Sequence, residues 1–112
     1  MSEHNIQSET IHLPTEAVFV SKTVGAPSST EWNTSNDGHK FYTVNVTFLP
    51  PFDAKPVCHI GLTNFDTDEH PRIDVSIEEV YADHVTVKFV TWAGSIIYGA
   101  TVHLLAIGPR KK

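Results

Sequence analysis

A tryptophan at the end of a predicted strand is the side chain best placed to hold a small ligand. In residues 84–92 the core-facing phase falls on positions 85, 87, 89 and 91. Trp92 therefore falls on the outward phase, next to the turn at residues 93–95. An outward indole is a flat, amphipathic platform, and the apolar C–H face of a sugar stacks on such a ring. The alternative is a tryptophan that closes the end of the fold or is buried in an interface, and the residues alone favour neither.

Arg72 is a second candidate ligand-binding residue. It is the only arginine before the C-terminal tail, and it falls on an outward phase, out of step with Ile73 and Val75. Its fork of N–H donors suits adjacent hydroxyl oxygens or a carboxylate. The alternative is a surface ion pair with one of the nearby acids, an interaction that contributes little to stability.

Motifs for catalysis are absent from the sequence. There is no HExxH, GxSxG, P-loop or GxGxxG pattern, and the seven histidines have no i,i+4 partner. His103 either lies near an oligomer axis or is a histidine satisfied by its surroundings. The acidic segment at residues 66–69 has three interpretations. The favoured one is an ordinary turn, the second is a source of calcium ligands, and the least favoured is a carboxylate pair for glycoside hydrolysis. We therefore expect a protein that is not an enzyme, with no catalytic residue, metal or cofactor, calcium being the one ion left open.

Composition indicates one small globular domain. The chain has 112 residues, of which 40% are hydrophobic and 19% charged. Its net charge of −5 argues against a nucleic-acid partner, because such binding requires basic residues to replace phosphate counterions. The one basic cluster, residues 110–112, is predicted to be a solvated tail.

Cys58 is the only cysteine, so the fold cannot contain an internal disulfide. It lies in the apolar run 57–60 and is predicted to be a small buried hydrophobe. No apolar run is long enough to span a membrane, and residues 1–5 are polar and lack the core of a signal peptide. We expect no membrane insertion and a cytoplasmic location as encoded, with release by a non-secretory route if the protein acts at cell surfaces.

Alternation of apolar and polar residues predicts an all-β fold. It is clearest in residues 42–48, 73–78 and 84–89, and shorter runs at 17–20 and 57–62 also predict strands. Turn-forming residues separate these runs. Several short strands at fairly even spacing indicate an antiparallel sandwich or barrel.

The last predicted strand, residues 96–107, is apolar on both faces. Positions 100, 102, 104 and 106 can face the core, while Ile97, Leu105 and Ile107 occupy the opposite face. A neighbouring subunit could cover that second face. Equally, the N-terminal segment could fold back over it with the apolar residues Ile11, Leu13, Val18 and Val20.

The order of these blocks resembles an H-type lectin domain, the family of snail agglutinins and of the C-terminal domain of slime-mould discoidins. The resemblance covers roughly residues 40–108. Its matching blocks are residues 44–48, 56–57, 62–66, 72–73, 87–92, 96–98 and 105–108. It divides the domain into an N-terminal arm and loop at residues 1–36, a lectin-like sandwich at 37–109 and the tail at 110–112.

This resemblance implies a six-stranded antiparallel β-sandwich, here with an extra N-terminal strand or arm, that assembles as a trimer or a pair of trimers. It also implies shallow sites near the protomer boundaries that bind galactose-type sugars, typically N-acetylgalactosamine. Arg72 matches the arginine that contacts sugar hydroxyls, Trp92 the tryptophan at the sugar site, and Tyr98 the aromatic residue six positions later. Asp37, in the turn at residues 36–38, matches the sugar-binding aspartate.

The chain departs from the family pattern at several positions. Ala93 stands where the snail lectin has a histidine that donates to the sugar, Leu104 replaces a usual tryptophan, and the snail-type cysteines are absent. The leading hypothesis is a multivalent, agglutinin-like lectin for galactose or N-acetylgalactosamine that binds glycans as a homotrimer or hexamer. The alternative, which Ala93 favours, is a trimeric structural module, such as a fibre or adhesin tip, with a degenerate sugar site.

Overall fold

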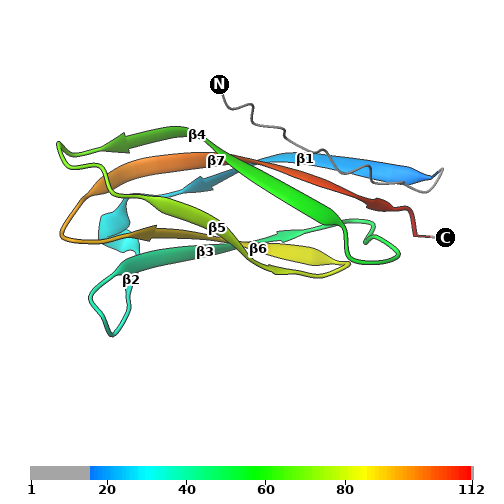
Figure 1. Cartoon of the computed structure of the whole chain (residues 1–112), viewed down its shortest axis with the longest axis horizontal. Helices are drawn as coiled ribbons and strands as arrows, with labels where there is room; N and C mark the ends of the chain where they lie inside the picture. Colours follow the sequence, from blue (N-terminus) through cyan, green and yellow to red (C-terminus); the bar gives the residue numbers. More distant parts are fainter. Residues whose placement is uncertain (1–15, 112) are drawn as a thin grey trace, which may run out of the picture.

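The strands of this protein follow the predicted alternation closely. The computed structural model describes residues 16–111, which form seven strands and one short 3-10 turn. These elements are labelled in Figure 1 and are β1 (Ala17–Ala26), η1 (Ser29–Glu31), β2 (Asn33–Thr34), β3 (Lys40–Thr47), β4 (Val57–Thr67), β5 (Asp74–Val80), β6 (His84–Thr91) and β7 (Ile97–Pro109). None of the described residues belongs to a helix that is long and apolar enough to cross a membrane.

Two antiparallel sheets lie one above the other as a sandwich (Figure 1). One sheet has the order β1-β7-β4, which we call sheet A, and the other has the order β2-β3-β6-β5, which we call sheet B. The prediction of an all-β antiparallel sandwich is confirmed. The described residues contain seven strands, because the N-terminal segment supplies a ten-residue edge strand, β1, and β2 adds a two-residue strand beside β3.

The core lies between the two sheets. Val85, Val87 and Phe89 of β6 are fully buried, as the alternation predicted. The predicted core face of β7 is also confirmed, because positions 100, 102, 104 and 106 are all buried. Each large apolar side chain removed from water in this way contributes roughly 1.5–3 kcal/mol. Cys58 is half-buried on the inner side of β4, and burial raises the pKa of its thiol.

The prediction that Ile97 lies on the outer face of the last strand is wrong, because Ile97 is fully buried in the core. The cause is a β-bulge: Asp66 pairs with Gly99 and Thr67 pairs with Ile97, so that Tyr98 is an extra residue on β7. The extra residue reverses the alternation at the start of the strand. Leu105 and Ile107 do lie on the outer face of sheet A, half-buried.

The outer face of sheet A carries an apolar row of Phe19, Ile107 and Val57, which lie opposite one another in the registers of the three strands. Phe19 is 63% exposed and Val57 is 57% exposed. The N-terminal segment does not cover this row with Val18 and Val20, because both pack against the core from β1. Ile11 and Leu13 lie outside the described residues.

Candidate functional site

Three strands of sheet B bring Trp92 together with two polar side chains. Continuing the β3–β6 register by one residue places His39 opposite Trp92, and continuing the β5–β6 register by two residues places Arg72 on its other side. Residues opposite one another in an antiparallel pair project from the same face. The ring centroids of His39 and Trp92 are 6.3 Å apart, with a tilt of 42° between the planes.

The indole of Trp92 is open to solvent, with 36% of the residue exposed. It lines a cavity of about 400 Å³ together with His39, Ile73, Asp74 and Val90. The wall of this cavity therefore combines an aromatic platform, an imidazole, a carboxylate and aliphatic carbon. The alternative of a tryptophan that closes the core is wrong for Trp92.

A tight turn holds Trp92 in this position. Ala93 and Gly94 both have positive φ angles, 55° and 75°, and the N–H of Ser95 donates to the carbonyl of Trp92 at 3.2 Å. Two successive positive φ angles are typical of a type I′ turn. Ser95 itself is buried, and its hydroxyl donates to the carbonyl of His70. The connection between β6 and β7 is thus anchored to the connection between β4 and β5.

Two hydrogen bonds hold Arg72 against the end of β6 and the connection between β6 and β7. Its Nη1 donates to the hydroxyl of Ser95 at 2.9 Å, and its carbonyl accepts from the hydroxyl of Thr91 at 2.5 Å. Among the described residues it forms no ion pair with an acid, contrary to the alternative considered for it. Among the described residues, the guanidinium is therefore oriented by a neutral hydrogen-bond partner.

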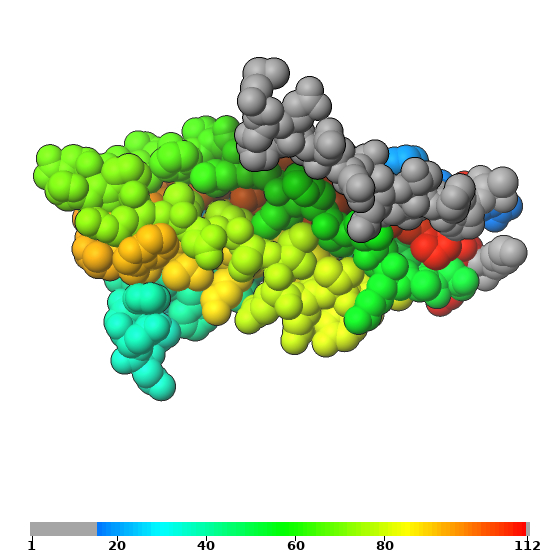
Figure 2. Space-filling view, in the orientation of Figure 1, coloured from blue at the N-terminus to red at the C-terminus, as the bar shows by residue number. Residues whose placement is uncertain are grey.

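Asp37 reaches this group through His39. The carboxylate of Asp37 accepts from the hydroxyl of Ser35 and, at 3.0 Å, from the N–H of His39, and its other oxygen lies 3.5 Å from His39 Nδ1. The Ser35 hydroxyl, followed by the His39 N–H, holds the pKa of Asp37 below its usual value of 3.8. Figure 2 shows the segment before β3, in cyan, projecting beside the orange connection between β6 and β7. Asp37 is exposed, and because its pKa is lowered it is a charged acceptor at neutral pH.

Tyr98 lies apart from these residues. It is 53% exposed at the start of β7 in sheet A, where it lines a different cavity with Asn64 and Asp66. Of the four predicted site residues, only Trp92 lines the cavity of about 400 Å³. Asp37 reaches that cavity through His39, Arg72 lies opposite Trp92 only in the extended β5–β6 register, and Tyr98 lines a different cavity.

His39 and Asp74 are the residues of the site that sequence reasoning missed. His39 precedes β3, two residues after Asp37, and Asp74 opens β5, two residues after Arg72. The alternation of side chains could have indicated both residues. Continued to the residue before β3 and to the first residue of β5, it places His39 and Asp74 on the outward face.

The other polar candidates have structural roles. Asp68 accepts from the N–H groups of His70 and Ile96, both at 3.1 Å, as in an ordinary turn. The prediction of a turn over residues 66–69 is wrong for Asp66 and Thr67, which are the last residues of β4 and pair with β7. His103 Nε2 lies 2.6 Å from the hydroxyl of Ser21, on the outer face of sheet A. Within residues 16–111, no group of three or more His, Cys, Asp or Glu side chains is arranged to hold a metal ion.

Residues 43–107 match the family model of the H-type lectin domain. This chain belongs to the H-type lectin domain family. The match includes Arg72, Trp92 and Tyr98, whereas Asp37 and His39 precede it. Membership identifies the protein as a carbohydrate-binding lectin, a class that binds sugars without transforming them.

The lectin fold is similar to that of discoidin II of Dictyostelium discoideum. Its recombinant form superposes with a TM-score of 0.73 at 18% identity, covering 91% of this chain and 41% of that one. Wild-type discoidin II gives a TM-score of 0.73 at 18% identity, covering 90% and 40%. The lectin thus spans about two fifths of discoidin II. It is also 30% identical to a protein of Fuscovulum blasticum described as "ATP synthase subunits region ORF 7". The aligned 76 residues are 66% of this chain and 66% of that protein.

Proposed function

We propose that this lectin binds galactose or N-acetylgalactosamine at the cavity beside Trp92, and that several copies act together on a glycan-covered surface. The observation that carries the proposal is the exposed indole of Trp92, which shares a cavity with His39 and Asp74 and has the His39 imidazole 6.3 Å away between ring centroids. Arg72 supports it through the β5–β6 register, which places the residue opposite Trp92 when it is extended by two positions.

The chemistry of the site suits a galactose-type sugar. Its axial hydroxyl leaves a continuous C–H face on the opposite side of the ring, which would stack on the indole of Trp92. Arg72 and His39 would donate to hydroxyl oxygens, while the charged carboxylate of Asp37 would accept from hydroxyl groups. Because the cavity is shallow and open, one site would bind with a Kd of about 1 mM, or roughly −4 kcal/mol.

Self-association would raise this weak affinity to a useful one. Several sites on one rigid assembly increase the apparent affinity by factors of about 10² to 10⁴. The apolar row of Phe19, Ile107 and Val57 supports an assembly through sheet A, because a row this exposed is typical of an interaction surface. A trimer, or a hexamer made of two trimers, would leave the Trp92 sites on sheet B accessible.

The test is a glycan array combined with a mass measurement in solution, on the wild type and on Trp92→Ala. We expect the variant to remain folded and associated and to lose at least about tenfold in affinity for galactosides, since stacking on an aromatic ring is the main apolar contact. The matched control is Tyr81→Ala, which removes another exposed aromatic ring, from the connection between β5 and β6. Binding by Trp92→Ala at the wild-type level would overturn the site assignment.

The same measurement separates this proposal from a trimeric structural module with a degenerate sugar site. The observation that favours such a module is Ala93, at the position where the snail lectin has a donor histidine. A wild type that associates normally but binds no glycan on the array would favour the structural role.

A further inference from the structure

One edge of the sandwich is open. In sheet B, β2 pairs only with Lys40 and Phe41, so that residues 42–47 of β3 have a neighbouring strand on one side only, in β6. In sheet A, β1 is the edge strand, and Val18 and Val20 on its inner face are only partly buried against the core. Within residues 16–111, the two sheets therefore leave a groove between β1 and the chain that follows β3.

This groove, which we call the basic groove, is a cavity of about 630 Å³. It lies where the start of β1, the end of β7 and the connection between β3 and β4 meet, at one end of the sandwich (Figure 1). Cavities of several hundred Å³ with mostly apolar walls and a few polar groups are typical of small-molecule sites. The basic groove therefore has the dimensions of a site for a small molecule.

The wall of the basic groove is apolar and rigid. Phe48 and Phe52 line it and are only 2% and 5% exposed, so they form its floor. Pro50 and Pro51 also line it, and a proline has a fixed φ and no N–H to donate. Leu49 is 86% exposed beside them. Such a wall suits an aliphatic chain, because covering exposed apolar surface with apolar carbon removes both from water.

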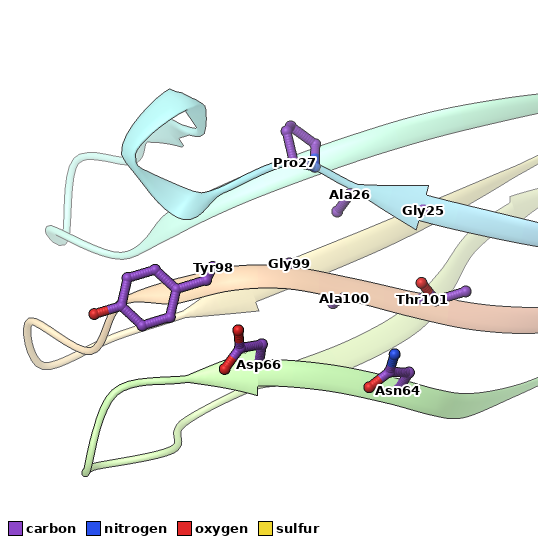
Figure 3. A pocket seen from close by; sticks show the side chains of 9 residues that line it. All are labelled: Gly25, Ala26, Pro27, Asn64, Asp66, Tyr98, Gly99, Ala100 and Thr101. Atoms are coloured by element: carbon purple, nitrogen blue, oxygen red, sulfur yellow. The ribbon is translucent and has the colours of Figure 1, made fainter.

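The rim of the groove is positively charged. Lys22, Arg110 and Lys111 are among its lining residues, and none of the lining residues is an acid. In the described part of the chain, none of these three cations forms an ion pair. By contrast, the cavity beside Tyr98 (Figure 3) and the Trp92 cavity each include a carboxylate, and neither includes a lysine or an arginine. In a chain with a net charge of −5, the groove is a local positive region that favours an anion.

The backbone holds Arg110 at one end of the groove. Its N–H donates to the carbonyl of Glu16 at 3.0 Å, and the residue forms an isolated antiparallel bridge with Phe52. The N–H of Asp53 donates to the carbonyl of Pro109 at 3.1 Å. These bonds fix the position of Arg110 between β1 and the β3–β4 connection, while the residue itself is exposed. A guanidinium placed in this way can pair with a carboxylate through two parallel hydrogen bonds.

Lys22 lies toward the other end of the groove. It is on the inner phase of β1, between Val20 and Val24, and it pairs with Leu104, so that roughly 20 Å of extended strand separate it from Arg110. An inward-pointing lysine on an edge strand discourages pairing with another strand. The groove is therefore poorly suited to an added peptide strand or a second copy of the chain. The methylene groups of Lys22 extend the apolar wall instead.

We propose that the basic groove binds one free aliphatic carboxylate, a medium-chain fatty acid. Its alkyl chain lies along β1 against Phe48, Leu49 and Phe52, and its carboxylate pairs with Arg110 and Lys111. The inference goes beyond the proposed function, because the basic groove and the Trp92 cavity have no lining residue in common.

The test is calorimetric titration of the full chain with hexanoate, octanoate and decanoate, each below the concentration at which it forms micelles. We expect one site per chain, with an affinity that rises by about fourfold for each methylene group added. 1-Decanol, which has the same chain length but no charge, should bind at least about tenfold more weakly than decanoate, because it cannot form charge-assisted hydrogen bonds with both cations.

Two pairs of variants locate the site. Arg110→Met/Lys111→Met should weaken decanoate binding by at least about tenfold and leave 1-decanol binding unchanged. Lys22→Met is the matched control, because it keeps an unbranched apolar stem and lies far from the carboxylate, and it should bind decanoate like the wild type. Leu49→Asp changes an exposed residue and should abolish binding, whereas Tyr98→Asp, at an exposed aromatic position outside the groove, should not.

Three results would overturn the fatty-acid site. The first is an affinity that does not depend on chain length, and the second is decanoate binding that survives both Arg110→Met/Lys111→Met and Leu49→Asp. The third is binding of the chain to phosphatidylglycerol vesicles through these same residues without any fatty acid, which would assign the cations to a membrane surface. Trp92→Ala should bind decanoate normally, so a loss of galactoside binding alone would refute the proposed function and leave this site standing.

Discussion

Position 93 shows how one residue adapts this lectin site. Its alanine has a φ of 55°, a region in which Asn, Asp and His are several-fold enriched over other L residues. The imidazole beside Trp92 comes instead from His39, across the sheet. In the proposed site, a donor that is next to the tryptophan in space would thus replace one that is next to it in sequence.

Ala93→His should therefore add a second donor without disturbing the turn. We expect an unchanged or higher melting temperature and an affinity for galactosides about fivefold higher, which corresponds to one hydrogen bond of roughly 1 kcal/mol. Ala93→Asn tolerates the same backbone but supplies no imidazole, and its affinity should stay at the wild-type level. Calorimetric titration measures the difference, and equal affinities for the His and Asn variants would contradict the expectation.

The acceptor at Asp37 predicts a specific pH dependence. Because the pKa of its carboxyl is lowered in the folded protein, any stability it contributes is present above its usual value of 3.8 and is lost as the pH falls through the lower folded value. Galactoside binding should thus persist from pH 7 to pH 5 and decline only at pH values below about 3.8.

Asp37→Asn is the matched test of this pH dependence. It should bind more weakly than the wild type between pH 5 and pH 7 and should lack the decline at acidic pH. Tryptophan fluorescence titrations measure binding, and circular dichroism at each pH verifies that the protein is folded. An identical acidic decline in the variant would assign the effect to another group.

At the scale of elements, the end of β7 packs against the connection between β3 and β4 at Gly108, where there is no space for a Cβ atom. A Cβ on Gly108 would lie 2.8 Å from Phe52 Cδ1 and 3.1 Å from the backbone Cα of Pro56. Phe52 is itself buried and packs edge-on against Phe48, with ring centroids 5.0 Å apart. The close approach at Gly108 thus fixes the connection between β3 and β4 against the end of β7.

Gly108→Ala should lower the free energy of unfolding by about 1–3 kcal/mol, the usual cost of overpacking. Gly61→Ala provides the control, because its added methyl group meets no neighbour and restricts the unfolded chain, so that stability should be equal or slightly higher. Urea denaturation of both variants tests the pair. Equal urea midpoints for Gly108→Ala and the wild type would show that the β3–β4 connection shifts to accommodate the methyl group without loss of stability.

At the scale of the whole molecule, the two outer faces of the sandwich are suited to different tasks. Sheet B presents the Trp92 cavity, and sheet A presents the apolar row of Phe19, Ile107 and Val57. Association through the apolar row would separate assembly from the Trp92 site, so a change that abolishes one should leave the other intact.

The double variant Phe19→Asp/Val57→Asp should reduce the mass in solution from that of an oligomer to that of a single chain. Its binding to a glycan-coated surface should fall by about 10² to 10⁴, while its affinity for a free monosaccharide should remain unchanged. Tyr81→Asp places the same charge on an exposed aromatic position in the connection between β5 and β6, away from sheet A, and should keep the oligomer. An unchanged mass for the double variant would exclude the apolar row as the interface.

The sequence by itself determined the strands of this protein and the direction of many of their side chains. Val85, Val87 and Phe89 were predicted to face the core and Trp92 to face outward, because alternation along a strand is a local property of the extended backbone. The order of apolar blocks also indicated the family, which the match over residues 43–107 confirms.

Only the tertiary structure decided which side chains share a site. His39 lies beside Trp92 because of the β3–β6 register, and a bulge at Tyr98 turns Ile97 into the core. Tyr98, six residues from Trp92 in the chain, belongs to the other sheet. Registers and bulges depend on hydrogen bonds between segments that are distant in sequence, so no local pattern specifies them.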